Sequence, residues 1–383
     1  MSSKATSRQP MSVTTMRQCA LACLSLLLSV GLFASSGMAI KHAQNFEITQ
    51  YDTHRILTVK NTFRGSFINY DYALVPKGRD IPELPKGIKV IRTPVEKVVA
   101  METVYIGYLE ALDQLDTISA AATVNFITNS KVLEGVASGA IQSVQSGQTI
   151  NVEKLILLQP DLILTSVSGD ANFDMPAKLE RTGLPIALTA GYMEQHPLAR
   201  AEWIKFVAAF LEEDERARII FDHIEQRYLE LTALTKQLDD RPTILCGAPY
   251  SSVWHVPGGE SFTARMIRDA GGDYLWSNDK SQGGIPLDIE RVFLKAANAD
   301  YWLNPSYYRS MKALSSADKR FGKFAAAENG TVFNNTRQVS PKGGNAIWES
   351  GIVHPDEVLA DLIHIFHPEL LPHHELVYYE QLK

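Results

Sequence analysis

Four of the ten histidines lie close together near the end of the chain, in HIFHPELLPHH at 364–374. Imidazole nitrogens are common ligands of zinc and of haem iron, so this cluster is a candidate metal site. His364 and His367 are one helical turn apart, but two prolines interrupt the helix that would align His373 and His374 with them. The spacing is therefore poor for zinc, and a free-zinc binding protein that uses these histidines remains an alternative.

Motifs that carry the common enzyme chemistries are missing from the sequence. It contains no G-x-S-x-G, no H-E-x-x-H, no G-x-x-x-x-G-K-[ST], and no G-x-G-x-x-G behind a predicted strand. Without the first 39 residues only Cys246 remains, and one thiol forms no intrachain disulfide and no iron–sulfur cluster. We therefore expect a protein that is not an enzyme and has no catalytic residues.

Two glutamates recur in matching units, INVEKLILLQPDLILT in the first half of the chain and LDIERVFLKAANADYWLN in the second. In each unit a candidate N-cap, Asn151 or Asp288, precedes the glutamate, Glu153 or Glu290, by two residues. An acidic residue in a first turn suits the helix dipole, so a purely local role is one interpretation. The recurrence indicates that both halves use the same structural unit.

The elements that must position these residues alternate between strand and helix. Near-continuous apolar runs predict buried strands, and segments with apolar residues at three-to-four spacing predict helices. Strands are expected at 96–101, 117–123, 161–167, 185–190, 241–249, 300–305 and 332–336, and helices at 103–115, 151–159, 173–183, 261–272, 288–297 and 355–371. This alternation predicts parallel sheets with helices on both faces.

Two stretches break this alternation. Residues 197–211 and 214–238 have long helical patterns, and we interpret the second as a rigid connector. Residues 44–95 form short alternating segments with turn residues, typical of β-strands. The sequence thus predicts an α/β protein with two Rossmann-like lobes, an interdomain helix and a β-rich extension packed on the first lobe. Their ranges are 40–95 for the extension, 96–212 for the first lobe, 213–238 for the helix and 239–383 for the second lobe.

Residues 1–39 have the three parts of a secretory signal. A basic start precedes an apolar run at 19–34, and small residues follow, with cleavage expected near Ala39. The run is shorter than the ~20 residues of a spanning helix. Cys19 and Cys23 lie at its start, whereas a lipid-anchored protein needs a cysteine just after it. We therefore expect a soluble protein of the periplasm.

Several segments, in the right order, resemble one family. The two glutamate units, WHVPGGESFTARMIRDAGGDYLW at 254–276 and HPELL at 367–371 are similar to signature segments of periplasmic substrate-binding proteins for iron–siderophore and cobalamin ABC importers. Ala299 stands where a proline is usual. The resemblance covers roughly 95–383. It implies two lobes joined by one long helix, with the ligand in the cleft between them and only small closure movements.

The resemblance also implies a partner. In that family each lobe presents one surface glutamate to arginines of the membrane permease, and Glu153 and Glu290 occupy those positions. We therefore expect a monomer that docks on the permease dimer of an ABC importer in the inner membrane. The net charge of −6 argues against nucleic acid and anionic membrane surfaces as partners.

In such a fold the cleft is built from loops that follow the strands. The predicted ligand-binding residues are Thr103, Tyr105, Thr123, Asn125, Ser252, Trp254, Tyr307, Tyr308, Arg309 and Trp348. Aromatic rings offer contact area at little entropic cost, and an arginine could pair with an anionic group. Packing beneath a loop is the alternative role of each ring. Trp203 and Trp302 are assigned instead to the interdomain helix and to a buried strand.

The ligand that these residues suit is a large, flat, partly apolar metal chelate. An Fe(III)–siderophore is the first choice, and a corrinoid or haem is the alternative within the same fold. We expect no resident cofactor and no metal bound to a dedicated set of side chains.

Overall fold

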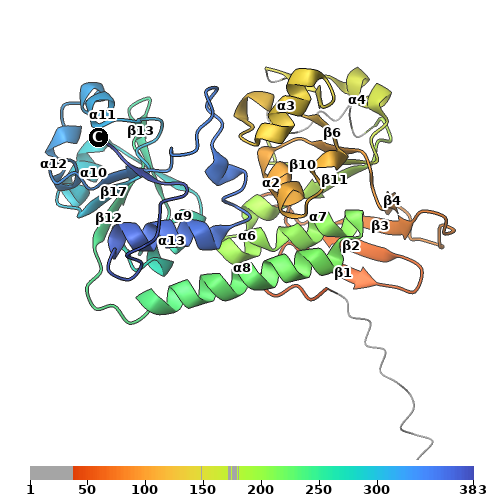
Figure 1. Cartoon of the computed structure of the whole chain (residues 1–383), viewed down its shortest axis with the longest axis horizontal. Coiled ribbons are helices and arrows are strands. Elements are labelled where there is room, and N and C mark those ends of the chain that lie inside the picture. Colours follow the sequence, from red (N-terminus) through yellow and green to blue (C-terminus); the bar gives the residue numbers. More distant parts are fainter. Residues whose placement is uncertain (1–37, 148, 171–173, 175–178, 180) are drawn as a thin grey trace, which may run out of the picture. The chain divides into compact units, whose positions relative to one another are not determined.

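The computed structural model describes residues 38–147, 149–170, 174, 179 and 181–383. The predicted signal, with Cys19 and Cys23, and most of the predicted helix at 173–183 lie outside these residues. Residues 38–383 form one compact unit that contains two α/β lobes (Figure 1). The α/β fold class predicted from the sequence is confirmed.

The N-terminal lobe is built on a parallel five-stranded sheet with the order β11-β10-β5-β6-β7. Its strands are β5 (Val98–Ala100), β6 (Ile118–Ala121), β7 (Gln142–Ser143), β10 (Leu162–Ser166) and β11 (Ile186–Thr189). Its helices include α2 (Thr103–Ala111), α3 (Ser130–Ser138) and α4 (Val152–Leu158). A small hairpin joins β8 (Gln145–Ser146) to β9 (Thr149–Ile150). Helix α3 was not expected from the sequence.

The C-terminal lobe has a second five-stranded sheet with the order β15-β12-β17-β18-β19, parallel except for β19. Its strands are β12 (Thr243–Cys246), β15 (Asp273–Tyr274), β17 (Tyr301–Leu303), β18 (Val332–Asn334) and β19 (Glu380–Gln381). An antiparallel sheet adds β13 (Pro249–Tyr250), β14 (Val253–Pro257) and β16 (Gly284–Leu287). The helices are α9 (Phe262–Asp269), α10 (Ile289–Ala296), α11 (Met311–Ala317), α12 (Ala325–Glu328) and α13 (Pro355–Phe366).

Each of the two glutamate units also contains an aspartate just before its strand, Asp161 or Asp300. Asp161 accepts hydrogen bonds from the backbone N–H groups of Glu96 (2.8 Å) and Lys97 (3.1 Å), at the entrance to β5. Asp300 accepts one from the N–H of Thr243 (2.7 Å), at the start of β12. In both lobes the aspartate before one strand therefore fixes the start of its parallel neighbour.

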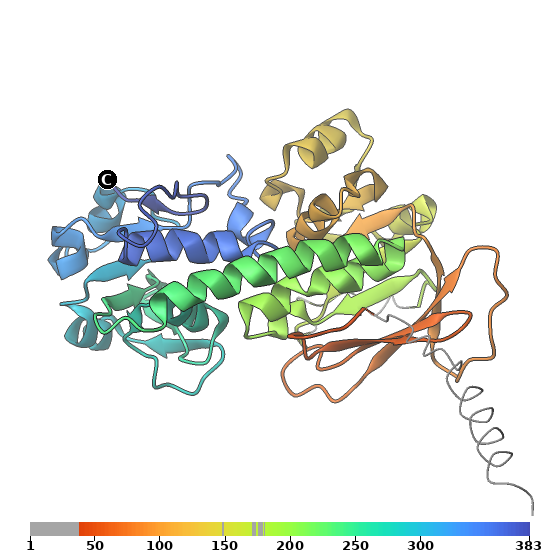
Figure 2. The same ribbon diagram turned by 60° about the horizontal axis from the view of Figure 1, so that its bottom comes forward.

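Three helices lie between the two sheets in sequence, α6 (Pro197–Ala201), α7 (Trp203–Leu211) and α8 (Asp214–Thr235). Helix α8 lies within the range predicted for the interdomain helix, and it packs on α7 of the first lobe and α13 of the second (Figures 1 and 2). The single helix predicted at 197–211 is divided at Glu202. This carboxylate accepts hydrogen bonds from the N-terminal segment, which packs against the break.

The N-terminal extension forms a separate four-stranded sheet with the order β1-β2-β3-β4. Its strands are β1 (Phe46–Gln50), β2 (Arg55–Val59), β3 (Tyr70–Pro76) and β4 (Lys89–Thr93). It packs on α7, with the rings of Phe46 and Trp203 4.7 Å apart and the N–H of Val95 bonded to the carbonyl of Phe210 (2.9 Å). The extension thus shares its hydrophobic core with the first lobe.

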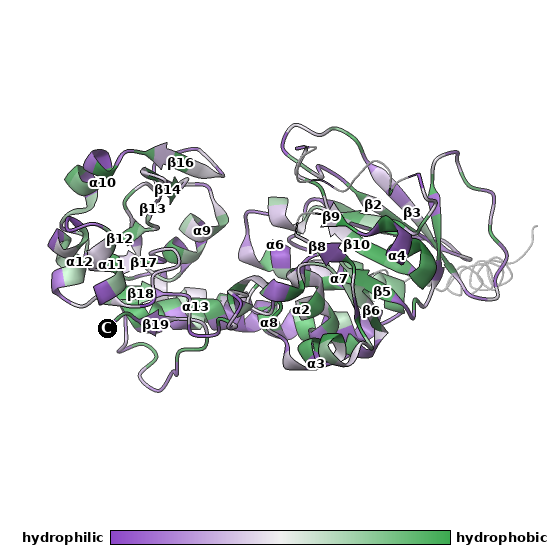
Figure 3. Ribbon diagram, turned by 90° about the horizontal axis from the view of Figure 1, so that it is seen from above, coloured by the Kyte–Doolittle hydropathy of each residue, from purple (hydrophilic) through white to green (hydrophobic). Residues whose placement is uncertain are grey.

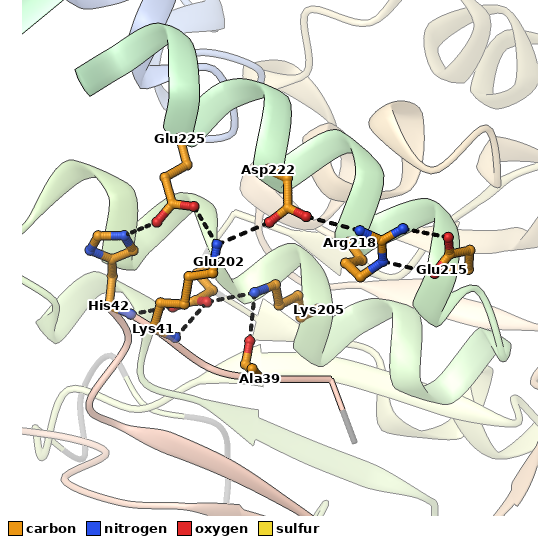
Figure 4. Close-up of polar contacts among 9 residues, drawn as sticks. All are labelled: Ala39, Lys41, His42, Glu202, Lys205, Glu215, Arg218, Asp222 and Glu225. Carbon is orange, nitrogen blue, oxygen red and sulfur yellow. Dashed lines mark hydrogen bonds and ion pairs between the residues drawn. The ribbon is translucent and has the colours of Figure 1, made fainter. Parts of the chain in front are cut away.

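A polar network fixes the segment before β1, as Figure 4 shows. Glu202 and Lys205 form a buried ion pair (2.7 Å), and Lys205 also donates to the carbonyl oxygen of Ala39 (2.7 Å). Lys41 pairs with Asp222 (3.1 Å) and Glu225 (2.5 Å) on α8. Ala39, near which signal cleavage is expected, is therefore the first residue of a segment held by buried charges.

Apolar residues occupy most of the sheet strands, whereas α8 is largely polar (Figure 3). In the part of the chain that the structure describes, no helix combines the length and hydrophobicity that a membrane span requires.

Candidate ligand cleft

A cavity of about 640 Å³, partly open to solvent, lies at the carboxyl ends of β5, β10 and β11. Its walls come from these strand ends, from α2, α6 and α7, and from Trp348 and Ile352 of the C-terminal lobe. The lining residues are Glu102, Val104, Tyr105, Tyr108, Ser166, Thr189, Gly191, Tyr192, Arg200, Trp203, Val207, Trp348 and Ile352. The carboxyl edge of a parallel sheet is the usual position of ligands in α/β folds.

A second cavity of about 440 Å³ lies at the carboxyl ends of β17 and β18, where Asn304 and Asn335 line it. Trp348 and Ile352 also line this cavity, so the two spaces meet at these residues. We call them together the interlobe cleft. Both volumes include space that is open to solvent.

Trp348 lies at the centre of this cleft because its segment bonds to the other lobe. Its neighbour Glu349 accepts hydrogen bonds from the N–H groups of Thr128 (2.9 Å) and Asn129 (2.8 Å) and from the Thr128 hydroxyl (2.8 Å). Burial raises the pKa of Glu349, and these bonds oppose that shift. We call residues 343–351 the interlobe strap. The Trp348 side chain is half exposed, so a ligand in the cleft can reach it.

Arg200 is the cation in the wall of the cleft. Its Nε donates to the carbonyl of Glu194 and its Nη2 to that of Tyr192, each at 2.8 Å, and its Cζ lies 4.1 Å from the centre of the Phe262 ring. Burial lowers the pKa of Arg200 to about 10, so the guanidinium stays charged at neutral pH. Those two bonds use two of its five N–H donors, and the others are available for an anionic ligand.

Buried polar groups complete the first cavity. Glu102 accepts a hydrogen bond from the N–H of Ser166 (2.9 Å), and burial raises the pKa of Glu102. The hydroxyls of Tyr105 and Thr189 are hydrogen-bonded at 2.8 Å, and burial raises the pKa of Tyr105 well above its usual value. These contacts hold the side chains in fixed positions around an otherwise aromatic site.

Of the ten residues predicted to bind ligand, Tyr105 and Trp348 line the interlobe cleft. The prediction for Trp254 needs correction because this residue is fully buried. Its ring lies 5.7 Å from that of Trp302 and its Nε1 donates to the carbonyl of Cys246 (3.1 Å). Trp254 is thus a core residue like Trp302, which was predicted to be buried.

The other seven predicted residues lie outside the walls of the cleft. Thr103 and Thr123 are half-buried, Tyr307 and Tyr308 have their rings 4.6 Å apart, and Asn125, Ser252 and Arg309 are exposed. All seven follow strands, as expected, but they do not line the two cavities. Their contact with a ligand stays a prediction.

Sequence reasoning missed Tyr192, Arg200 and the cleft-facing role of Trp203. The strand-end rule was not applied to β11, although it would have led to Tyr192, just beyond that strand. Arg200 and Trp203 lie in a segment interpreted only as a long helix. Trp203 was assigned to the interdomain helix but lies in α7 of the first lobe, and its buried ring forms part of the cavity wall.

The two glutamates predicted to dock lie where the helix pattern placed them. Asn151 and Asp288 cap α4 and α10 by accepting from the N–H groups three residues later, so both predicted caps are confirmed. Glu153 and Glu290 are exposed in the first turns, and Figure 3 shows the two helices on different lobes. Glu290 also accepts a hydrogen bond from Arg320 (2.7 Å).

Histidines near the C-terminus make separate contacts within the protein. His364 bonds to the carbonyl of Leu371 (2.9 Å), His374 to Asp361 (2.7 Å), and the buried His367 lies 3.3 Å from the carbonyl of Gly271. Among the described residues no group of three or more His, Cys, Asp or Glu side chains is placed to hold a metal ion. The zinc alternative therefore gains no support from this geometry.

Two lobes with a cleft at the carboxyl ends of both sheets define a class of bilobal binding proteins. The periplasmic binding protein family model matches residues 98–336, and the chain belongs to this family. An uncharacterized lipoprotein of Methanocaldococcus jannaschii is 27% identical over 355 residues, which are 86% of this chain and 82% of that protein. That relative is described as a lipoprotein, whereas the sequence of this chain predicted a soluble protein without a lipid anchor.

Solved structures share the fold at low sequence identity. A periplasmic heme binding protein from Pseudomonas aeruginosa has a TM-score of 0.55 and 15% identity, and the match covers 76% of this chain and 98% of that one. An ABC-type Fe3+-hydroxamate transport system protein from Saccharomonospora viridis has a TM-score of 0.53 and 15% identity, with coverage of 73% and 93%. These similarities establish the fold.

Proposed function

We propose that this protein is the extracytoplasmic binding component of an ABC importer, which captures a metal chelate in the interlobe cleft and delivers it to a permease. The observation that carries the proposal is the composition of the cleft. Aromatic rings of Tyr105, Tyr192, Trp203 and Trp348 surround a space next to the charged Arg200. Rings supply contact with a large flat ligand, and the guanidinium supplies charge.

An Fe(III)–siderophore with an anionic group is the first candidate ligand, and haem or a corrinoid is the alternative. The charged Arg200 favours a ligand with carboxylate, catecholate or hydroxamate oxygens. The names of the similar solved structures, which mention heme and Fe3+-hydroxamate, agree with this class. Equilibrium dialysis of the protein against ferric hydroxamate, ferric catecholate, haem and cobalamin tests it. Retention of none of the four would contradict the proposal.

Each lobe presents the same pair of exposed residues for docking. Glu153 is followed four residues later by Leu157, whose side chain is 84% exposed, and Glu290 by Leu294, which is 86% exposed. Residues four apart lie on the same helix face, so each lobe displays a carboxylate beside an apolar side chain. Carboxylates that meet arginines of a partner set its orientation, and an exposed leucine adds contact area.

Charge reversal tests this docking. Glu153→Lys and Glu290→Lys should abolish transport of the bound chelate, because each places a cation opposite the permease arginines. Affinity for the chelate should stay unchanged, since neither residue lines the cleft. Glu230→Lys, at an exposed position of α8, is the matched control and should leave transport intact. Normal transport by both variants would exclude these glutamates from docking.

A further inference from the structure

A larger cavity lies outside the interlobe cleft. It measures about 1430 Å³, is open to solvent, and is formed by the extension, the segment 193–199 and helix α9 of the C-terminal lobe. None of the residues that line it also lines the interlobe cleft. Arg200 and Phe262, which are in contact, line the interlobe cleft and not this cavity. We call it the extension-side cavity.

Three arginines make this cavity cationic in a protein whose net charge is −6. Arg64 comes from the extension, and Arg265 and Arg268 come from α9. Arg265 pairs with Asp269 (3.0 Å), whereas Arg64 and Arg268 have no ion-pair partner among the described residues. Two guanidinium groups in the wall are thus free to bind an anion.

Two acidic residues, Glu194 and Glu260, also line this cavity. Glu194 is buried and accepts hydrogen bonds from the N–H groups of Gln44 and Asn45, each at 2.9 Å, and burial raises its pKa. Glu260 is exposed and lies 3.5 Å from Lys280. Arg265 is paired with Asp269 and Glu260 with Lys280, so Arg64 and Arg268 are the two cations that remain in the wall, beside the single carboxylate of Glu194.

His196 also lines the cavity, and its ring is a neutral hydrogen-bond donor close to the charge of Arg265. Its Nδ1 accepts a hydrogen bond from the N–H of Leu198 (3.1 Å), so the hydrogen of the neutral ring is on Nε2. Burial, and then the charge of Arg265, lower the pKa of His196 to about 4. The ring is therefore uncharged at neutral pH and can donate a hydrogen bond.

The loop that carries Arg64 is fixed in place. The Tyr192 hydroxyl lies 3.0 Å from the carbonyl oxygen of Thr62, and the Phe63 ring fills the space where Gly169 lacks a side chain. The Arg64 guanidinium extends to the C-terminal lobe, where Nη2 is 3.6 Å from the position of a Cβ on Gly283. Cationic groups from the extension and from the C-terminal lobe thus face one space.

We propose that the extension-side cavity binds a small polyanion with carboxylate or phosphate oxygens, held by Arg64, Arg265 and Arg268. Guanidinium groups match such oxygens in geometry, and charge-assisted hydrogen bonds are stronger than neutral ones. The anion would offset the repulsion among the arginines and connect the extension to the C-terminal lobe. This site is distinct from the one that takes the chelate, so it does not rest on the proposed function.

Isothermal titration of the secreted, processed protein with citrate and, separately, with orthophosphate tests the proposal. One bound anion is expected, and Arg64→Gln or Arg268→Gln should each weaken its binding about tenfold or more. Arg291→Gln on α10 is the control and should change nothing, because this exposed arginine lies outside the cavity. Tighter binding of citrate identifies a polycarboxylate site, and tighter binding of phosphate identifies a phosphate site.

Two results would overturn the proposal. One is no heat of binding with either anion at millimolar concentration, and the other is binding that both glutamine variants leave unchanged. Trp348→Ala separates this site from the cleft, since it should lower chelate affinity and leave anion affinity unaltered. Loss of anion binding in that variant, which is folded if its thermal unfolding is unchanged, would also contradict a separate site.

Discussion

Arg200 and Arg309 have the same charge but different surroundings. Arg309 was predicted to pair with an anionic ligand because it follows a strand, yet it is exposed and does not line the cleft. Arg200 lies in a short helix, and its guanidinium is held by two carbonyls beside the cavity. The position of a cation relative to a cavity depends on packing between distant segments, which a strand-end rule does not include.

Exchanging the two arginines for glutamine should separate these roles. Arg200→Gln should lower the affinity for the chelate about 10- to 100-fold, because a charge-assisted contact contributes about 1.5–3 kcal/mol. Arg309→Gln tests the prediction that Arg309 contacts the ligand, and Arg291→Gln, at an exposed arginine that lines neither cavity, is the matched control and should leave the affinity unchanged. Dissociation constants from equilibrium dialysis give the comparison, and equal affinities of Arg200→Gln and Arg291→Gln would remove Arg200 from the binding site.

His196 should make the stability of the protein depend on pH. Its pKa is about 4 in the folded protein, chiefly because of burial, and its ordinary value is 6.5. Below pH 6.5 the unfolded chain gains a proton that the folded protein does not bind until about pH 4. The contribution of this residue is therefore complete above pH 6.5 and decreases as the pH falls towards 4. The full change would be about 3 kcal/mol, and solvent screening of this partly exposed ring reduces it to about 2 kcal/mol.

Urea unfolding of the protein and of His196→Asn between pH 4 and 7 measures this effect. Asparagine can still accept the hydrogen bond from Leu198 as an N-cap, but it does not titrate. The difference in free energy of unfolding between the two proteins should shrink or change sign in favour of the variant as the pH falls. A difference that is constant over this range would show that His196 has no such role.

At the level of elements, two ion pairs in the network of Figure 4 differ in burial, so they should differ in their contribution to the stability of the fold. The Glu202–Lys205 pair is buried, whereas the Lys41 side chain is 45% exposed. Glu202→Ala leaves the Lys205 ammonium buried without its carboxylate and should lower the free energy of unfolding by about 3–5 kcal/mol. Lys41→Ala should cost less than about 1 kcal/mol. Chemical denaturation measures both, and equal small effects would contradict this account.

Most elements could be predicted because their patterns are local. Alternating strands and helices, the helix caps at Asn151 and Asp288, and the long helix before residue 239 all follow from spacing and caps. Helix α3 was missed although its signals are local: Asn129 is its N-cap, and Val132 and Val136 have helical spacing. The break at Glu202 was missed because it depends on hydrogen bonds to residues more than 150 positions away.

On the scale of the described unit, the lobes are joined at several places, two of which are helix α8 and the interlobe strap. Helix α8 packs on both, and the interlobe strap carries Glu349 from the C-terminal lobe to Thr128 and Asn129 of the first. Gly344 of the strap has no room for a side chain because the carbonyl of Phe126 lies against it. Contacts at several places allow less movement than one flexible hinge, which agrees with the small closure expected from the family resemblance.

The strap also explains why only part of the cleft could be predicted. Trp348 was found from its position before the last helix, and Tyr105 from its position after a strand. Trp254 has the same kind of position, but its strand pairs in a small antiparallel sheet and directs the ring into the core. The direction of a side chain after a strand depends on which neighbour that strand pairs with.

Trp348 fluorescence gives the most direct test of the central claim that both lobes enclose a metal chelate. The protein and Trp348→Phe should be titrated with ferric hydroxamate, ferric catecholate, haem and cobalamin, and intrinsic tryptophan emission should be followed. We predict saturable quenching at a stoichiometry of one by one chelate class, with a markedly smaller amplitude in the variant. Quenching of equal amplitude in both proteins, or no saturable response to any of the four, would contradict the account.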